Sequence, residues 1–499
     1  MKAVQDFDNR ITSEQTAFVF ARNQELWTWQ RLTSEVNRLS SGLIGLGIQP
    51  GDRVILHMAN LPEFIVAYLA CFQVGAIAAP LNIRLKSAEL EPLLQRLRPS
   101  LYIGQAALYD RIVSVDASTL GANRRFVVEG PVDDRRAQPW SNLLGATNLA
   151  PDRRIVDANA PALLLTTSGT TGRPKFVTHT LATLRKSAES FRHWDLDITQ
   201  AAAAVAFPMV HVSGCFTVLA CLWSGVPFVL FERFDPDAIL DGIEFHRCTW
   251  FAGLPFMYGD LLQSQKARAR NVDSLRTCLV AGDVCPLELQ KEFLTVFGVP
   301  LRSIWASTEA MACLTYGLEP GPISRVANGT DFRLVNDHHA PVRIGEIGEL
   351  VLRSPNIAVG YWAGPGLIED TPKDGWFHTG DLMREDGEGN LWFVSRKKFL
   401  IIRGGSNISP VEVEQVLASH PAVQDAAVIG VPDPELGERV AGFIQVRSTD
   451  LPSVVLKDIR GYLTERLADY KIPEQLKILS QIPRNALGKI DRKALNSLL

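Results

Sequence analysis

The segment 163–175 carries residue types and a spacing that suit one chemistry, the binding of an anion. An apolar stretch, Leu163–Leu165, is followed by hydroxyl side chains and two glycines, and the run ends at Lys175. Glycines let backbone N–H groups crowd an anion, hydroxyls add donors and the lysine adds charge. The segment therefore predicts a polyphosphate-binding loop after a buried strand. Its predicted ligands are Thr167, Ser168, Gly169, Thr170, Thr171, Gly172 and Lys175.

This loop differs from a P-loop of the G-x-x-x-x-G-K-[ST] kind. The spacing differs, and Phe176 follows the lysine where that motif has its metal-binding hydroxyl. A Ser/Thr-rich turn without a ligand is the alternative. The unbroken run of small polar residues into Gly-x-x-Gly-x-Pro-Lys favours the phosphate loop.

Four more segments carry related chemistry, in order along the chain: 305–309, 376–381, 395–410 and 483–489. They read Trp-Ala-Ser-Thr-Glu, Trp-Phe-His-Thr-Gly-Asp, a basic stretch that runs through Gly404-Gly405, and Pro-Arg-Asn-Ala-Leu-Gly-Lys. With 163–175 they resemble the signature motifs of the adenylate-forming superfamily, which includes acyl-CoA synthetases, aryl-CoA ligases, luciferases and peptide-synthetase adenylation domains. Because the motifs follow in order over nearly the whole chain, the protein is identified as a member of that superfamily.

The resemblance implies a reaction in two steps. A carboxylate attacks the α-phosphorus of ATP to give an acyl-adenylate and pyrophosphate, and a thiol then attacks the activated carbonyl. The implied cofactors and co-substrates are ATP, Mg²⁺ and coenzyme A, and the implied partner is a small carboxylic acid. Both reactants of the first step are anions, so the site must screen charge and hold them in line.

The resemblance also implies roles for individual residues. Glu309 would bind Mg²⁺, since one carboxylate beside phosphates is a usual protein contribution to such a site. Thr308 would donate to the α-phosphate, and Trp305 would stack on adenine where relatives have tyrosine. Asp381 would accept from two ribose hydroxyls, and Arg396 would brace the ribose and the hinge. The alternatives are turn residues for Glu309 and Asp381 and a core position for Trp305.

Lys489 completes the implied catalytic set of Lys489, Thr308 and Glu309. Its ammonium would neutralise charge between the carboxylate and the α-phosphate, and it reaches them only if the C-terminal lobe closes. Gly404 and Gly405 would line a passage for the thiol of CoA, because a side chain there would block it. A plain turn is the alternative for the two glycines.

The segment 208–214 resembles the Pro-x-x-His-x-x-Gly stretch that lines the acyl site of CoA ligases. His211 would be a wall or gate of that site, and a core histidine is an alternative of equal weight. Relatives that activate amino acids have an aspartate near the position of Val212, which argues against an α-amino acid as substrate. The predicted acyl pocket comprises His211, Val212, Ser213, Val280, Ala281 and Ala306, and Gly282, Asp283, Trp305 and Ala306 would line the adenine side.

Three positions depart from the family pattern. Phe176 replaces the usual glycine after the phosphate-loop lysine, and Phe399 stands at the hinge position that usually holds Asp or Lys. Asp283 ends a shelf that usually reads Gly-Gly-Ala, and it would either form a salt bridge or contact a polar substituent on the acyl group. Phe399 leaves domain rotation as an expectation but puts its rate in question.

Helix and strand patterns alternate through the first third of the chain and again through 160–305, which predicts parallel sheets covered by helices. Short strands between 328 and 393 predict a small β-barrel or antiparallel sheet. Ser409 opens a new α/β unit with a capping box. The predicted fold class is α/β. A large N-terminal domain, 1–395, would contain two stacked α/β subdomains and the small barrel and would bind ATP and the acid. A small, mobile α+β lid, 396–499, would carry Lys489.

Composition bounds the remaining possibilities. The 499 residues are 46% hydrophobic and 21% charged, with a formal net charge of −3, which gives no reason to expect a nucleic-acid partner. Seven cysteines without a CxxC pair and a charged beginning predict a cytoplasmic protein. The segment 198–231 lacks Asp, Glu, Lys and Arg, yet its prolines and glycines predict strand, helix and strand rather than a transmembrane segment.

The sequence leaves three questions open. The thiol acceptor is CoA in the preferred interpretation, and the phosphopantetheine of a carrier protein is the alternative. A non-catalytic nucleotide-binding relative is a further alternative, which the complete set of Lys175, Glu309, Asp381 and Lys489 argues against. Whether the chain forms a homodimer is not predicted either way.

Overall fold

A computed structural model of the chain describes residues 13–499 except for short segments. These are 117, 122, 146–155, 168–173, 192–201, 283, 312–313, 316–324, 327–328, 370–374, 405, 448–451 and 486–487. The predicted ligands Ser168, Gly169, Thr170, Thr171, Gly172, Asp283 and Gly405 therefore lie outside the described residues.

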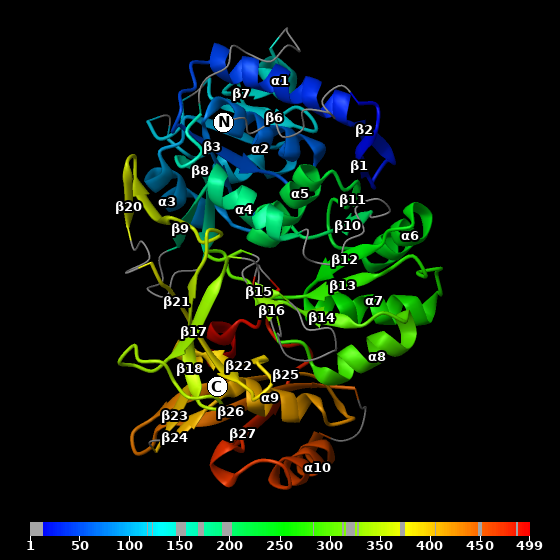
Figure 1. Ribbon diagram of the computed structural model, residues 1–499, viewed down its shortest axis with the longest axis vertical. Helices are drawn as coiled ribbons and strands as arrows, with labels where there is room; N and C mark the ends of the chain where they lie inside the picture. Colours follow the sequence, from blue (N-terminus) through cyan, green and yellow to red (C-terminus); the bar gives the residue numbers. More distant parts are fainter. Residues whose placement is uncertain are drawn as a thin grey trace.

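The large N-terminal part is built on two sheets, which occupy the upper and middle parts of Figure 1. One sheet has the strand order β20-β19-β9-β8-β4-β3-β5-β6-β7. Its strands are β3 (Arg53–His57), β4 (Ile77–Pro80), β5 (Leu101–Gln105), β6 (Arg125–Val128), β7 (Ala137–Pro139), β8 (Pro161–Thr167), β9 (Lys175–Thr180), β19 (Gly360–Gly364) and β20 (Leu367–Glu369). The pairs from β8 through β4, β3, β5 and β6 to β7 are parallel, as the alternating pattern predicts.

The second sheet has the order β14-β13-β12-β10-β11-β1-β2. Its strands are β1 (Thr16–Phe20), β2 (Glu25–Thr28), β10 (Ala203–Val205), β11 (Phe228–Leu230), β12 (Trp250–Gly253), β13 (Thr277–Val280) and β14 (Leu301–Ser303). The neighbours β10, β12, β13 and β14 run parallel, so the loops after them leave the same edge. Ligands of α/β proteins bind at such carboxyl edges.

Helices cover both sheets. They are α1 (Trp29–Gly45), α2 (Pro62–Val74), α3 (Ser87–Leu97), α4 (Leu181–Phe191), α5 (Val212–Ser224), α6 (Pro236–His246), α7 (Pro255–Ala267) and α8 (Leu287–Phe297), with the 3₁₀ turns η2 (Ala106–Ile112) and η3 (Trp140–Leu143). Nearly every side chain of α2 and of α5 is buried, as expected for helices that are apolar all round. One hydrophobic core combines these two helices with residues of both sheets, such as Leu56 of β3 and Trp250 of β12.

The charge-free segment 198–231 forms β10, α5 and β11 where the structure describes it, which confirms the strand–helix–strand prediction. No described helix combines the length and the apolar character needed to cross a bilayer. Burial raises the pKa of the thiols of Cys71, Cys215 and Cys278 to about 12, so these cysteines are protonated core residues, as predicted.

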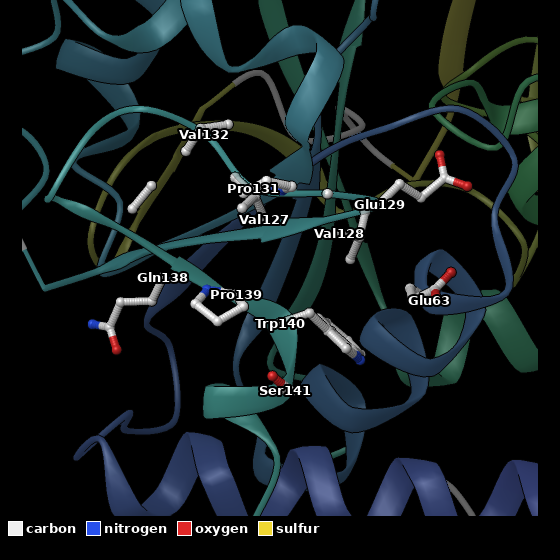
Figure 2. A pocket seen from close by; sticks show the side chains of 12 residues that line it. Glu63, Val127, Val128, Glu129, Pro131, Val132, Gln138, Pro139, Trp140 and Ser141 are labelled. Atoms are coloured by element: carbon white, nitrogen blue, oxygen red, sulfur yellow. The ribbon is translucent and has the colours of Figure 1, made fainter.

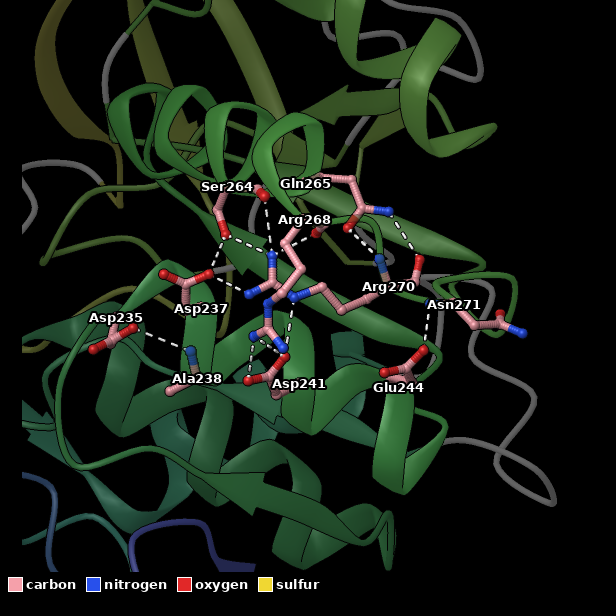
Figure 3. Close-up of polar contacts among 10 residues, drawn as sticks. All are labelled: Asp235, Asp237, Ala238, Asp241, Glu244, Ser264, Gln265, Arg268, Arg270 and Asn271. Carbon is pink, nitrogen blue, oxygen red and sulfur yellow. Dashed lines mark hydrogen bonds and ion pairs between the residues drawn. The ribbon is translucent and has the colours of Figure 1, made fainter.

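Arg270 ties α6 to the segment that follows α7 (Figure 3). Its side chain is only 1% exposed, and it pairs with Asp237 and with Asp241, whose Oδ1 lies 3.0 Å from Arg270 Nε. Its Nη1 also donates to the carbonyl of Ser264 in α7 at 2.9 Å. A buried guanidinium is tolerated only when its donors are satisfied in this way. The network fixes two of the helices that cover the second sheet.

A small antiparallel sheet follows, with the order β17-β18-β21-β22. Its strands are β17 (Asp331–Val335), β18 (Ile347–Arg353), β21 (Phe377–Glu385) and β22 (Leu391–Arg396), and a separate pair comprises β15 (Leu314–Thr315) and β16 (Arg325–Val326). Of the two forms that the sequence predicted for this region, a small barrel or an antiparallel sheet, the described strands form the sheet, with β17 and β22 at its two ends. The predicted domain boundary at 395 falls at the end of β22.

The C-terminal part occupies the lower end of Figure 1. It contains η4 (Lys397–Phe399), β23 (Ile401–Arg403), β24 (Ser406–Ile408), α9 (Pro410–Ala418), β25 (Val423–Asp433), β26 (Gly437–Val446), α10 (Pro452–Thr464), η5 (Asp469–Lys471), β27 (Gln475–Ile478) and α11 (Arg492–Asn496). Ser409 caps α9, since its Oγ accepts a hydrogen bond from the backbone N–H of Glu412 at 3.2 Å, as the capping box predicts.

Candidate active site

Asp381 and Arg396 are brought together by strand register. They are direct partners across the antiparallel pair β21 and β22, so their side chains lie on one face. Arg396 Nε lies 2.8 Å from Oδ1 of Asp381, and the carboxylate side chain is 4% exposed. The structure thus joins two residues that the sequence assigned to the same nucleotide.

The backbone around Asp381 is held by its neighbours. The backbone N–H of Asp381 donates to Thr379 Oγ1 at 3.0 Å, and that hydroxyl donates to the Leu350 carbonyl at 2.8 Å. Gly380 has φ +71°, a conformation that favours glycine, and its N–H donates to Glu349 Oε1 at 3.2 Å. These contacts fix where the Asp381 side chain emerges from the sheet.

Trp305 contacts Asp381 rather than solvent. Its Nε1–H donates to Oδ2 of Asp381 at 2.8 Å. The ring is 7% exposed and belongs to the hydrophobic cluster under the small sheet, with Leu350 and Met383. The hydrogen bond between Trp305 and Asp381 was not foreseen from the sequence, which offered stacking on adenine or a core position; the burial of the ring agrees with the core position.

Glu309 and Lys175 meet at Tyr361, a residue that the sequence reasoning missed. The Tyr361 hydroxyl donates to Oε1 of Glu309 at 2.9 Å, and Lys175 Nζ lies 4.1 Å from the centre of the Tyr361 ring. Tyr361 pairs with Val177 across β19 and β9, which places it diagonally opposite Lys175. No spacing signal in the sequence connects position 361 with 175 or 309.

His179 is a second residue that the motifs did not reveal. Its Nε2 lies 2.8 Å from the carbonyl oxygen of Thr308, so Nε2 carries the proton and donates. Burial lowers the pKa of His179 to about 4, so the ring is neutral at pH 7. His179 therefore anchors the backbone beside the predicted metal ligand Glu309.

Lys489 reaches the large domain. A Cβ on Gly282 would lie 3.9 Å from Cε of Lys489, and one on Gly488 would lie 2.7 Å from Phe256. Asn485 closes the lysine loop, because its Oδ1 accepts from the Lys489 N–H at 3.2 Å. In Figure 1 the red C-terminal segment lies at the junction between the upper and lower parts of the molecule. The lysine loop thus packs against the large domain.

The predicted acyl residues follow parallel strands of the second sheet. Val280 ends β13, Ala281 donates from its N–H to the Gly253 carbonyl at 3.2 Å, and Ile304 donates to the Val280 carbonyl at 3.0 Å, which brings Ala306 to the same edge. His211 is the N-cap residue of α5, followed by Val212 and Ser213. These segments meet at the carboxyl edge of the sheet.

Positive charge concentrates around Lys489. The pKa of His211 falls to about 4, first because of burial and then because Lys489 and Arg84 are near. The pKa of Lys398 is also lowered, mainly by burial and then by Arg396 and Lys489. Lys489, Arg396 and Lys398 are therefore close enough to affect one another's charge, while the carboxylate of Asp381 acts on Lys398 in the opposite direction. The arrangement suits a polyphosphate.

Two departures from the family pattern have structural accounts. Phe176 is 1% exposed and packs edge-on against Trp362 at 6.1 Å between ring centres, so it faces the core while Lys175 faces the other side of β9. Phe399 lies between two cations, with Lys398 Nζ 4.9 Å and Arg492 Cζ 5.1 Å from its ring centre.

Two other predicted residues lie at element ends. Thr167 is the last residue of β8 and pairs with Lys175, so the two ends of the predicted phosphate loop are neighbours. Gly404 has φ +55°, and its N–H donates to the Leu436 carbonyl at 2.7 Å within the C-terminal part. Its described contacts do not connect it to Lys489.

A separate cavity of about 470 Å³ lies at the β6–β7 edge of the first sheet (Figure 2). It is lined by Glu63, by Val127–Val132 and by Ala137–Ser141. None of the residues predicted for ATP, acid or CoA lines it, so this cavity is not the candidate active site.

Comparisons with known proteins show the family to which the chain belongs. The sequence model of the family of AMP-binding enzymes matches residues 7–362, and the sequence model of the AMP-binding enzyme C-terminal domain matches residues 412–489. Feruloyl-CoA synthase from Amycolatopsis sp is 32% identical over 470 residues, which cover 93% of this chain and 92% of the relative. Medium-chain fatty-acid–CoA ligase from Escherichia coli (strain K12) is 30% identical over 486 residues, covering 93% and 84%.

Solved structures match over nearly the full length. The anthranilate CoA ligase AuaEII in complex with anthranoyl-AMP has a TM-score of 0.89 at 26% identity, covering 100% of this chain and 97% of that one. O-succinylbenzoate coenzyme A synthetase (MenE) from Bacillus subtilis, in complex with ATP and magnesium ion, has a TM-score of 0.82 at 27% identity, covering 99% and 98%. The chain therefore belongs to the adenylate-forming superfamily of AMP-binding enzymes, and it is an acid–thiol ligase.

Proposed function

We propose that this ligase uses ATP to convert a small to medium aliphatic or aromatic carboxylic acid into its CoA thioester through an acyl-adenylate. The observation that carries the proposal is that Lys489 lies close to Gly282. The charge of Lys489 also contributes to the lowered pKa of His211, after burial. In this proposal the Lys489 ammonium acts between the predicted nucleotide shelf and the predicted acyl wall. That is where a carboxylate and an α-phosphate must meet.

In the first step a carboxylate oxygen of the acid bonds to the α-phosphorus, and the bond from that phosphorus to pyrophosphate breaks. Lys489 stabilises the negative charge shared by the two reactants. Thr308 donates to the α-phosphate, Lys175 holds the outer phosphates, and Asp381 with Arg396 holds the ribose. Fixing both anions in this way removes much of the entropic barrier.

Mg²⁺ fits beside Glu309. The hydroxyl of Tyr361 donates to Oε1 of this carboxylate and the ammonium of Lys175 lies over the same ring, so the carboxylate proposed for Mg²⁺ and the lysine proposed for the phosphates contact one side chain. Bound there, the ion would neutralise charge on the outer phosphates as pyrophosphate leaves.

In the second step the thiol sulfur bonds to the carbonyl carbon, AMP leaves, and the thiol proton is lost to solvent.

The class of acid is narrowed by what the acyl segments lack. His211 is neutral at pH 7 because of burial, and Val212 offers no carboxylate to an α-ammonium group. The relatives compared above act, by their names, on feruloyl, anthranoyl and medium-chain fatty acyl groups. An acid whose tail is apolar or aromatic and uncharged fits both facts.

A panel of acids tests the proposal. Pyrophosphate release is measured with aromatic, medium-chain and amino acids, and the products are separated to detect acyl-AMP and acyl-CoA. We expect release with at least one aromatic or medium-chain acid, and thioester on addition of CoA. Release with amino acids alone would refute the substrate class, and thioester only with a phosphopantetheine carrier protein would refute CoA as the acceptor.

A further inference from the structure

Trp305 and Asp381 form a buried pair on the nucleotide side of the candidate site. The indole Nε1–H donates to Asp381 Oδ2 at 2.8 Å, and the two residues are 7% and 3% exposed. A hydrogen bond to an ionised carboxylate is stronger than a neutral one, and the low local dielectric strengthens it further. The pair therefore has the means to fix the orientation of the carboxylate.

The two oxygens of Asp381 are not equivalent. Oδ2 accepts from Trp305. Oδ1 lies 2.8 Å from Arg396 Nε as an ion pair, but no donor among the described residues makes a well-directed hydrogen bond to this buried oxygen. A carboxylate oxygen has two lone pairs, and buried polar atoms rarely stay without a hydrogen-bond partner. Oδ1 is therefore the oxygen left to accept a hydrogen bond from a ligand.

The indole is a fixed donor. Its ring packs in the cluster that contains Leu350 and Leu352 of β18 and Met383 of β21. Met383 lies two residues after Asp381 on the same strand. Movement of the indole would disturb the packing under the whole small sheet, so the N–H stays directed at Oδ2.

We propose that Trp305 is a positioning residue, which holds Asp381 so that Oδ1 accepts from the hydroxyl groups of a ribonucleotide's ribose. The inference rests on the proposed function in one respect, the assignment of Asp381 to the ribose. It goes beyond that function by making recognition of the ribose depend on the indole N–H.

The experiment measures nucleotide binding by calorimetry, without any acid. ATP, 2′-deoxy-ATP and 3′-deoxy-ATP are titrated into the full-length wild-type protein and into Trp305→Phe, Asp381→Asn and the double variant. We expect the wild type to prefer ATP over at least one deoxynucleotide. Trp305→Phe should reduce that preference about tenfold, as expected for loss of one hydrogen bond to a charged group. The double variant should prefer ATP over the deoxynucleotides by the same factor as Asp381→Asn alone, because the indole acts through Asp381.

Two results would overturn the inference. Equal weakening of ATP and of both deoxynucleotides in Trp305→Phe would show that the ring acts by packing or stacking alone. A wild type that binds all three equally would remove Asp381 from the ribose. Thermal unfolding checks that the variants are folded, and Trp305→Tyr, which also lacks the indole N–H, replaces Trp305→Phe if the latter is not. The proposed function fails separately, by absence of acid-dependent pyrophosphate release from the wild type.

Discussion

The hydroxyl of Tyr361 donates a hydrogen bond to Oε1 of Glu309 at 2.9 Å, across 52 positions of the chain. The ring of the same tyrosine lies 4.1 Å from the ammonium of Lys175. One side chain thus orients the carboxylate assigned to Mg²⁺ and contacts the lysine assigned to the phosphates. The two functions of Tyr361 reside in different atoms, so they can be separated by substitution.

Tyr361→Phe removes the hydroxyl and keeps the ring. We expect the Mg²⁺ concentration for half-maximal pyrophosphate release to rise about tenfold, because residues that orient a metal ligand typically contribute that much to affinity. The KM for ATP at saturating Mg²⁺ should change little. Tyr361→Leu is the comparison: it removes the ring as well, and should also raise the KM for ATP. An unchanged Mg²⁺ requirement in Tyr361→Phe would contradict the role of the phenol.

Lys489→Ala should slow adenylate formation by about 100-fold or more, because it removes the charge that stabilises the first transition state. Thioester formation from supplied acyl-adenylate should be largely retained. Single-turnover assays measure the two steps separately. Lys493→Ala removes a nearby exposed lysine and is the control, with little effect expected on either step. Equal losses in both steps of Lys489→Ala would argue against the assignment.

Gly488→Val should prevent the lysine loop from docking. Gly488 has φ +78°, and a Cβ there would lie 2.7 Å from the Phe256 ring and 3.2 Å from Leu254. Adenylation should fall as in Lys489→Ala while the thermal unfolding of the protein changes little. Gly366→Val is the matched control, since φ is +75° but nothing lies within 4 Å of its Cβ position. If both variants lost adenylation alike, backbone strain rather than the clash would be responsible.

Gly404→Leu tests the predicted thiol passage. Because Gly404 lies in the C-terminal part with Leu436 as its neighbour, a larger side chain should leave pyrophosphate release intact. Thioester formation should fall by a factor of ten or more (an order-of-magnitude expectation for a blocked passage). Gly345→Leu, with φ +90° and open space around its Cβ position, controls for strain. Equal slowing of both steps would refute the passage.

Stability should fall on acidification through the buried histidines. The pKa values of His179 and His211 are lowered to about 4, chiefly by burial, whereas an unfolded histidine titrates near its ordinary value. Between these values the unfolded chain binds more protons, so the free energy of unfolding is fully present above about pH 6.5 and declines toward pH 4. Each histidine contributes on the order of 3 kcal/mol to that decline. Urea unfolding between pH 4.5 and 7.5 measures it.

His211→Asn provides the comparison for this pH dependence. The variant should show a shallower decline than the wild type over the same range, because one titrating group is gone. An identical slope would mean that His211 is solvated or charged in the folded protein. The comparison concerns stability only and needs no substrate.

The sequence predicted the parts of the site that lie in contiguous motifs. Asp381 and Arg396 came from two motifs and meet through strand register, and Lys489 and Gly282, which came from two others, lie close together. Motifs mark such positions because one loop or strand end gathers several functional groups in a short stretch. The parallel sheets and the apolar strand–helix–strand of 198–231 could be predicted for a similar reason, because the pattern of apolar residues within each element shows which of its side chains are buried.

The sequence did not reveal contacts that depend on pairing between distant strands. Tyr361 reaches Glu309 only because β19 lies antiparallel to β9, and His179 reaches Thr308 from a strand 129 positions away. Neither contact leaves a spacing pattern. The same holds for the hydrogen bond from Trp305 to Asp381 and for the choice between a barrel and an open sheet in the region of β17 to β22, which depends on which strands pair.

The register of β21 and β22 has a consequence for what happens between the two steps. Arg396, the partner of Asp381, is the final residue of its strand, and the segment from Lys397 onward leads into the part that carries Lys489. A rotation about a point after Arg396 would move Lys489 away from the site, while the ribose stayed bound to Asp381 and Arg396. The acyl-adenylate would then remain bound between the two steps, instead of being released into solvent and hydrolysed.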